Sequence, residues 1–330
     1  MTTMASTAMI LMVAMITTTL FSGSTRGMQV GYYDQQCPHV ERTVKEIVEG
    51  LLLKDVTAGA SLLRLVFHDC QVKACDASIL LVDDPRNGVL SELHSPKNFG
   101  IRRLNFINII KEQIERRCPG VVSCADIIVL AARDIVRSSG GPTIPVLTGR
   151  KDSKQAYKEL ADVIVPPADT TVDELLQIFT SKGMTIEETV ALLGSHTLGV
   201  SHCKSFYNRL EPQLDKSMSP ALAEDLKLLC HGQKVVTNAT NLLAAFNDRT
   251  NLVFDNQYFS DLAAGRGLLA VDANLASDPR TSQIVLRFSA SEREFFNAYV
   301  TAFLKLTQAA VLSDHDDAEV RTNCSAINQY

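Results

Sequence analysis

The most informative stretch of the 330-residue chain is Leu63-Arg64-Leu65-Val66-Phe67-His68-Asp69-Cys70. It lies within an apolar run, Ala58 to Cys70, which is long enough to form a helix. Because Arg64 and His68 are four residues apart, a helix would place both side chains on one face. A fixed cation beside a titratable imidazole suits a site where a proton moves while negative charge develops. An exposed pair on an amphipathic helix would explain the same spacing, so the pair alone decides nothing.

Oxygen-bearing side chains follow this stretch directly. Asp69, Asp76 and Ser78 lie beside and after the short segment from Cys70 to Cys75. Hard oxygen donors on one loop suit calcium, with backbone carbonyl groups completing the coordination shell. A solvated acidic turn is the alternative.

A second histidine motif is Leu193-Gly194-Ser195-His196-Thr197-Leu198-Gly199. The preceding Thr185-Ile186-Glu187-Glu188 predicts a capping box that opens a short helix, and Gly194 marks the end of that helix. His196 would then lie just past a helix end, where the flanking glycines allow close approach to a planar cofactor. A purely structural histidine would fit the same position.

Helical periodicity dominates the rest of the chain and predicts a mainly α fold in one domain. Weak strand signals occur at Thr143–Thr148 and Gly267–Val271. The further predicted helices cover Val40–Leu53, Leu104–Ile114, Ser123–Ser138 and Phe295–Thr307.

The N-terminus and the cysteines both indicate export. The apolar run Met9–Phe21 followed by small polar residues predicts a signal peptide over residues 1–28, leaving a domain at 29–330; a membrane anchor is the alternative. All eight cysteines follow this segment, and an even number in an exported chain suggests four disulfides, whose pairing the spacing leaves open. Asn238 and Asn323 begin glycosylation sequons.

Taken together, these motifs resemble the secreted plant (class III) haem peroxidases. The resemblance extends from Gly31 to Cys324 and rests on four segments in order: Phe67-His68-Asp69-Cys70, Cys75-Asp76-Ala77-Ser78, Val122-Ser123-Cys124-Ala125-Asp126 and Ser195-His196-Thr197-Leu198-Gly199. It implies a mainly α fold with minor β structure, in which a distal and a proximal helical half sandwich haem b. It also implies an enzyme that reduces hydrogen peroxide to water while oxidising phenolic donors in one-electron steps.

The resemblance assigns a role to individual residues. His68 would be the distal base, Arg64 the distal cation that stabilises the transition state, and Asn98 the amide that orients His68. His196 would bind the haem iron, with Asp272 behind it. Phe67 would line the distal pocket, Pro166 would lie at the substrate edge, and Asp126 and Arg150 would form a buried ion pair. The implied disulfides are Cys37–Cys118, Cys70–Cys75, Cys124–Cys324 and Cys203–Cys230.

Two calcium ions are also implied. The first site would use Asp69, Val72, Ala74, Asp76 and Ser78, with Glu92 reaching the ion through water. The second would use Thr197, Asn247, Thr250, Val253 and Asp255. Ala74 replaces the family's usual glycine, which is tolerable if its backbone angles are ordinary. Asn247 replaces an aspartate, so we expect weaker calcium binding there unless a local shift brings in Asp248.

The expected partners are hydrogen peroxide and small phenolic donors, for a monomer in the extracellular space or cell wall rather than the vacuole. A net charge of −5 argues against nucleic acid, and no membrane contact is expected after signal removal. A non-catalytic wall-binding protein on the same fold and a metal-dependent hydrolase using His68 and Asp69 are the alternatives. The histidines without a matching motif are expected at the surface or in packing: His39, His94, His202, His231 and His315.

Overall fold

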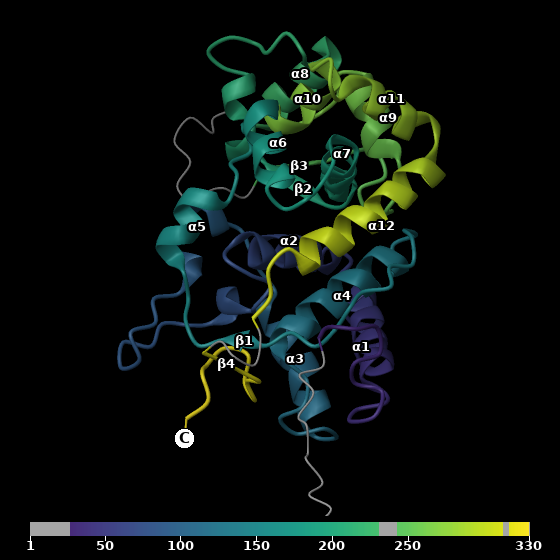
Figure 1. Ribbon diagram of the computed structural model, residues 1–330. Helices are drawn as coiled ribbons and strands as arrows, with labels where there is room; N and C mark the ends of the chain where they lie inside the picture. The colour runs from purple at the N-terminus through teal and green to yellow at the C-terminus, as the bar shows by residue number, and fades with distance from the viewer. Residues whose placement is uncertain (1–26, 231–242, 313–316, 330) are drawn as a thin grey trace, which may run out of the picture.

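The computed structural model describes residues 27–230, 243–312 and 317–329 (Figure 1). The predicted signal segment up to residue 26, the sequon at Asn238, and His231 and His315 lie outside the described residues. Among the residues that are described, no helix combines the length and the apolar character needed to cross a membrane.

The fold is mainly α-helical, as the periodicity predicted. In the N-terminal part the α-helices are α1 (Val40–Lys54), α2 (Ala58–Gln71), α3 (Leu104–Glu115) and α4 (Cys124–Ser138). They are followed by α5 (Lys158–Ile164), α6 (Val172–Thr180), α7 (Ile186–Leu193), α8 (Pro220–Leu229), α9 (Gln257–Ala263), α10 (Ala270–Ser277), α11 (Ser282–Ala290) and α12 (Glu292–Gln308). Short 3-10 turns connect them, among which η2 (Glu92–His94), η3 (Pro96–Asn98) and η4 (Gly194–Thr197) carry predicted site residues.

The helices form two groups, one above the other in Figure 1. Helices α1, α3 and α4 make the lower group, and α6 to α11 make the upper one. Helix α2 packs on α4, while the long α12 contacts both α7 and α2 and so joins the two groups. The motifs around His68 and His196 therefore come from elements that face each other across the middle of the molecule.

Hydrophobic burial explains why these segments fold as helices. In α1 the apolar positions Val40, Val44, Val48 and Leu51 recur on one buried face, whereas α4 is buried on nearly all sides. In the upper group, phenylalanine and tyrosine side chains of α9, α11 and α12 pack edge to face; Phe259 and Phe295 have ring centroids 4.9 Å apart. Such aromatic pairs add stabilisation beyond the area they bury.

Polar caps fix the helix ends near the site. The capping box predicted at Thr185 is present: its hydroxyl accepts from Glu188 N at 3.1 Å, and Glu188 Oε2 accepts from Thr185 N at 2.7 Å. Helix α6 has an equivalent box at Thr171, which the sequence analysis did not identify. At α4, the hydroxyl of Ser123 accepts from Asp126 N. These caps satisfy amide groups that a helix leaves unpaired at its start.

The strand predictions were largely wrong. Gly267–Val271 forms no strand and instead leads into α10, and Thr148 makes only an isolated bridge to Gln29. The strands that do form are two-residue and three-residue pairs: β1 (Asp152–Ser153) with β4 (Ala318–Glu319), and β2 (Val200–His202) with β3 (Ala244–Phe246), both antiparallel.

Candidate active site

A cavity of about 430 Å³ lies between the two groups of helices. Arg64, Phe67 and His68 line it from α2, and His196 lines it from η4 on the opposite wall. The remaining lining is predominantly apolar and includes Pro166, which the resemblance places at the substrate edge. The structure thus brings the two histidine motifs, which are 128 residues apart, to one site.

On the distal wall, His68 is held between two partners. Its Nδ1 lies 2.7 Å from Oδ1 of Asn98, and Arg64 Nε donates to its Nε2 at 3.1 Å. Because an amide oxygen can only accept, Nδ1 carries the proton and Nε2 is left as the basic nitrogen. Burial, together with the charge of Arg64, lowers the pKa of His68 to about 3. The imidazole is therefore neutral at ordinary pH and can accept a proton at Nε2.

Asn98 and Arg64 are themselves fixed by backbone carbonyl groups. The amide nitrogen of Asn98 donates to Glu92 O at 2.8 Å, which sets the orientation of its oxygen toward His68. Arg64 donates from Nη1 to Phe99 O at 3.0 Å. Burial lowers the pKa of Arg64 to about 10, so the guanidinium remains charged at neutral pH.

On the proximal wall, His196 is paired with a carboxylate. Its Nδ1 lies 2.9 Å from Oδ1 of Asp272, and the same oxygen accepts a hydrogen bond from Tyr258 at 2.8 Å. Burial alone would lower the pKa of His196, but the charge and hydrogen bond of Asp272 outweigh it and raise the pKa. Sequence reasoning found His196 and Asp272 but missed Tyr258, for which no motif had been recognised.

Two features of His196 indicate that this cavity suits haem. The Nδ1 of His196 is engaged by Asp272, which leaves Nε2 as the nitrogen able to bind a metal. In addition, 34% of the His196 side chain is exposed although its neighbours Gly194 and Thr197 are buried, because the ring borders the cavity. An apolar cavity with one free imidazole nitrogen and a polar distal pocket suits a planar iron cofactor.

Comparisons with known proteins point the same way. A family model described as peroxidase matches residues 43–291. The chain belongs to the peroxidase family. It is 41% identical to Peroxidase 29 of Arabidopsis thaliana over 92% of this chain and 90% of the relative. It is also 39% identical to Peroxidase 57, over 91% and 93%, and 37% identical to Peroxidase 21, over 91% of each, from the same plant.

These matches confirm the resemblance to the plant, class III, haem peroxidases. The protein is an oxidoreductase that uses hydrogen peroxide as acceptor together with a reducing donor, and its family implies a haem cofactor. The mainly helical fold agrees with this family.

The glycines of the proximal motif serve packing in this peroxidase. A Cβ on Gly194 would lie 2.5 Å from the ring of Phe295, and one on Gly199 would lie 2.5 Å from Cβ of Ala60. The close approach that glycine permits is therefore to α12 and α2. Whether they also make room for the cofactor beside His196 stays a prediction.

The predicted distal calcium ligands Asp69, Asp76, Ser78 and Glu92 are all fully buried. Oδ1 of Asp69 and Oδ2 of Asp76 have no hydrogen-bond partner, which is costly for buried carboxylates unless a cation is bound. Burial raises the pKa of Asp69 well above its usual range and that of Asp76 to about 7. The residues present therefore fit a hard cation, which would neutralise them.

Ala74, the unusual residue of this loop, has ordinary backbone angles. The non-glycine residues with positive φ in the described chain are Lys73, Ala77 and Arg103, so alanine is accommodated at 74 without strain. Within the described ranges, no three His, Cys, Asp or Glu side chains are arranged as a metal-ligand set. A calcium ion here would accordingly depend on hydroxyl and carbonyl oxygens as well.

The residues predicted for the second calcium site lie close together, with Asp248 in place of Asn247. Thr197 Oγ1 donates to Asp248 Oδ2 at 2.6 Å, and Thr250 Oγ1 lies 3.0 Å from Asp255 Oδ1. Thr197 Oγ1 is also 3.3 Å from the carbonyl oxygen of Val253. Asp248, and not the predicted Asn247, therefore shares this cluster.

Asn247 points elsewhere. Its Nδ2 donates to Leu198 O at 3.2 Å, its Oδ1 accepts from Ser201 at 2.7 Å, and it lines the haem-sized cavity. Asp248, the alternative ligand, therefore lies beside Thr197, whereas the Asn247 side chain binds Ser201 and Leu198. The expected loss of a negative ligand from this site does not follow.

The four implied disulfides are all present, and within the described residues no cysteine is free. The implied ion pair is present as well: Arg150 Nη1 lies 2.8 Å from Asp126 Oδ1, with both side chains fully buried. Of the remaining histidines, His94 pairs with Asp83 at the surface and His202 lines the cavity.

Proposed function

We propose that this peroxidase is an exported enzyme that binds haem b through His196 and couples reduction of hydrogen peroxide to one-electron oxidation of phenolic donors. The observation that carries the proposal is the convergence of two histidines on one cavity. His68 presents Nε2 from one wall and His196 presents Nε2 from the other, each with its Nδ1 already engaged. Bound haem would supply the redox-active iron at which peroxide is reduced.

The distal residues move the proton. In the structure, Nε2 of His68 accepts from Arg64; peroxide entering the pocket would replace this contact and give its proton to Nε2. Asn98 holds Nδ1–H, so the proton can be returned only from Nε2, to the oxygen that leaves as water. Arg64 stabilises the negative charge that develops as the O–O bond breaks, a contribution of about 3 kcal/mol for such a donor. In total, one peroxide and two donors, each losing one electron and one proton, give two waters and two donor radicals.

The proximal residues set the electron density on the iron ligand. Asp272 accepts the Nδ1 proton of His196 and so gives the imidazole partial anionic character. Tyr258 donates to the same oxygen and moderates this effect. Together Asp272 and Tyr258 keep the ring of His196 in one tautomer and one orientation.

Phenolic donors would reach the cavity at its edge beside Pro166. A phenol can lose one electron and one proton to give a radical that its ring stabilises, and an apolar rim suits that ring.

The proposal also covers signal cleavage, glycosylation and calcium binding. Residues 1–28 would be a signal peptide and 29–330 a single monomeric peroxidase domain of the extracellular space or cell wall, glycosylated at Asn238 and Asn323. Asn323 is exposed, which such a modification requires. Two calcium ions would bind, one at Asp69, Val72, Ala74, Asp76, Ser78 and Glu92, the other at Thr197, Asp248, Thr250, Val253 and Asp255.

Expression of the full-length chain in plant cells tests the proposal. We expect the protein in the medium, lacking its first residues, with a haem Soret band that changes on addition of peroxide. His196→Ala should abolish haem uptake, whereas His94→Ala, which alters a surface histidine paired with Asp83, should not. Haem uptake without a response to peroxide would instead support the non-catalytic wall-binding alternative.

A further inference from the structure

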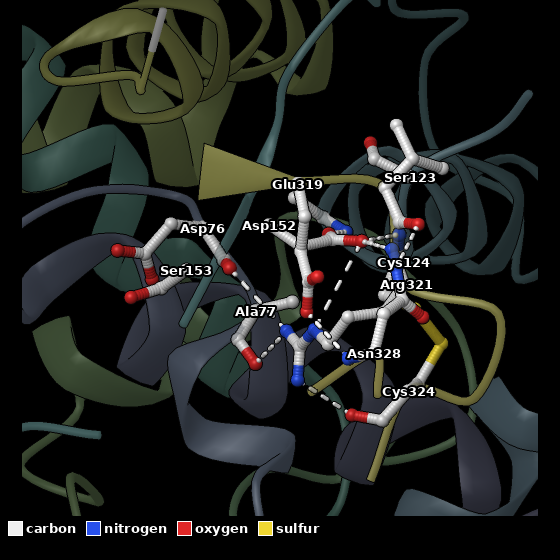
Figure 2. Close-up of polar contacts among 12 residues, drawn as sticks. Asp76, Ala77, Ser123, Cys124, Asp152, Ser153, Glu319, Arg321, Cys324 and Asn328 are labelled. Carbon is white, nitrogen blue, oxygen red and sulfur yellow. Dashed lines mark hydrogen bonds and ion pairs between the residues drawn. A yellow bond between two sulfur atoms is a disulfide. The ribbon is translucent and has the colours of Figure 1, made fainter. Parts of the chain in front are cut away.

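Arg321 is a fully buried arginine two residues after the end of β4 (Figure 2). Its Nη2 donates to the carbonyl of Ala77 at 2.6 Å, and its Nη1 donates to the carbonyl of Cys324 at 2.7 Å. The guanidinium thus joins the C-terminal segment to the loop that bears the proposed distal calcium ligands. None of the roles assigned above uses this residue.

Asp152 of β1 ties the same segment to α4. Its carboxylate accepts from the backbone amides of Cys124 at 3.0 Å, Ala125 at 2.9 Å and Arg321 at 2.9 Å. Its Oδ2 also lies 3.9 Å from Nε of Arg321, with both side chains fully buried. The neighbouring Ser153 donates from its amide to Asp76 O at 2.8 Å, so the carbonyl groups of two successive loop residues, 76 and 77, are both held (Figure 2).

The backbone of Ala77 explains why the loop needs such support. Its φ of 57° lies in the left-handed region, which is unfavourable for a residue with a Cβ because the Cβ crowds the neighbouring carbonyl oxygen. Asp69 Oδ2 accepts from Ala77 N at 3.1 Å on one side, and Arg321 binds Ala77 O on the other. This conformation determines where the side chains before and after it, Asp76 and Ser78, point.

We propose that Arg321 is a positioning residue for the distal cation site: it holds the Asp76–Ala77 backbone so that the oxygens of Asp76 and Ser78 converge with those of Asp69. The inference rests on the proposed calcium site. A residue that merely anchors the C-terminal segment would affect stability but not calcium affinity, because Cys124–Cys324 already fastens that segment covalently.

The variant Arg321→Lys tests this role. Lysine keeps the charge but replaces the planar fork with a single ammonium group, which cannot hold Ala77 O and Cys324 O in the same geometry. The matched control is Arg150→Lys, at another fully buried arginine, whose hydrogen bonds go to the carboxylate of Asp126 and to the carbonyl groups of Leu147 and Thr307, none of which belongs to this loop. Both changes are made in a protein that also carries Asp248→Ala. This substitution is designed to prevent calcium binding at the second site, so that the bound calcium that is measured belongs to the distal site.

The readout is bound calcium per protein, measured by atomic emission on the purified holoenzyme after dialysis against chelator buffers of known free calcium. We expect calcium binding to be about ten- to hundredfold weaker in Arg321→Lys, because a charge-assisted hydrogen bond is lost. In Arg150→Lys, calcium binding should be unchanged. Equal affinity in the two variants would overturn the inference. Absence of calcium from the Asp248→Ala parent would instead remove the distal site itself, together with the inference that depends on it.

A measurement on the unaltered protein covers the case in which Arg321→Lys fails to fold. Coupling between two sites is reciprocal, so removal of calcium should loosen the segment that Arg321 anchors. With chelator present, hydrogen exchange should become faster in 318–324 while that of α6 stays the same. Unchanged exchange in 318–324 after verified calcium loss would contradict the role of Arg321.

Discussion

Replacement of Tyr258 by phenylalanine should lower the reduction potential of the bound haem. Tyr258 is buried, and its hydroxyl donates to Oδ1 of Asp272 at 2.8 Å, the same oxygen that lies 2.9 Å from Nδ1 of His196. The two donors therefore compete for one carboxylate oxygen. Without the hydroxyl, Asp272 would accept more strongly from His196, the imidazole would donate more electron density, and ferric haem would be favoured over ferrous.

The size of the effect follows from the hydrogen bond that is lost. A hydrogen bond to a charged group contributes about 1.5–3 kcal/mol, and only the part that differs between the two oxidation states changes the potential. If that part is a third to a half, or about 0.5–1.5 kcal/mol, the potential falls by about 20–65 mV, since 59 mV corresponds to a tenfold change in a one-electron equilibrium.

Spectroelectrochemical titration of the holoenzyme measures this potential, and resonance Raman spectra of the ferrous form report the strength of the iron–histidine bond. Tyr299→Phe is the matched control, because its hydroxyl lies 3.0 Å from Ser195 Oγ, next to His196, and does not contact Asp272. A potential that is unchanged or raised in Tyr258→Phe, with the control at the wild-type value, would refute the reasoning.

Three further outcomes are expected. Because burial and Arg64 lower the pKa of His68 to about 3, the rate constant for reaction with peroxide should stay flat from about pH 8 to about pH 4; a decline centred on the usual histidine pKa would contradict this in stopped-flow measurements. Asp248→Ala should reduce bound calcium by one ion per protein, whereas Asn247→Ala should leave it unchanged, as atomic emission would show. Arg150→Met should lower the free energy of unfolding by about 3–5 kcal/mol, because it leaves Asp126 charged and buried; denaturant titration that shows less than 1 kcal/mol would argue against the pair.

Much of the helical framework could be predicted from the chain alone. Stretches such as Val40–Leu53 and Ser123–Ser138 have regular apolar periodicity and clear breakers, and the structure places helices there within one residue at each end. The capping box at Thr185 was equally informative, because its two hydrogen bonds involve residues only three apart. Local signals predict local structure well.

The errors occurred where distant contacts decide the conformation. The apolar run Gly267–Val271 looked like a strand, but Arg209 binds the carbonyl groups of Gly267 and Leu268 and directs the chain into α10. The resemblance implied Asn247 as a calcium ligand, whereas the structure pairs Asp248 with Thr197. Residue counting carries no information about such pairings.

In the candidate site, too, some residues could be predicted from the sequence and others could not. The resemblance supplied His68, Arg64, Asn98, His196 and Asp272, and the structure brings each beside the partner expected for it. Tyr258 and Arg321 were missed because their contacts join separate elements: Tyr258 joins α9 to α10, and Arg321 joins the segment after β4 to the loop after α2. No spacing rule predicts contacts of this kind.

The most direct test of the account is the reaction of the purified holoenzyme with hydrogen peroxide, followed by stopped-flow spectroscopy of the Soret band. The account predicts a rapid spectral change in the wild-type protein. In His68→Leu the change should be about 10²- to 10⁴-fold slower with haem still bound, because the base at Nε2 is lost while His196 and Asp272 are untouched. A His68→Leu variant that reacts with peroxide as fast as the wild type would contradict the central claim that His68 moves the proton.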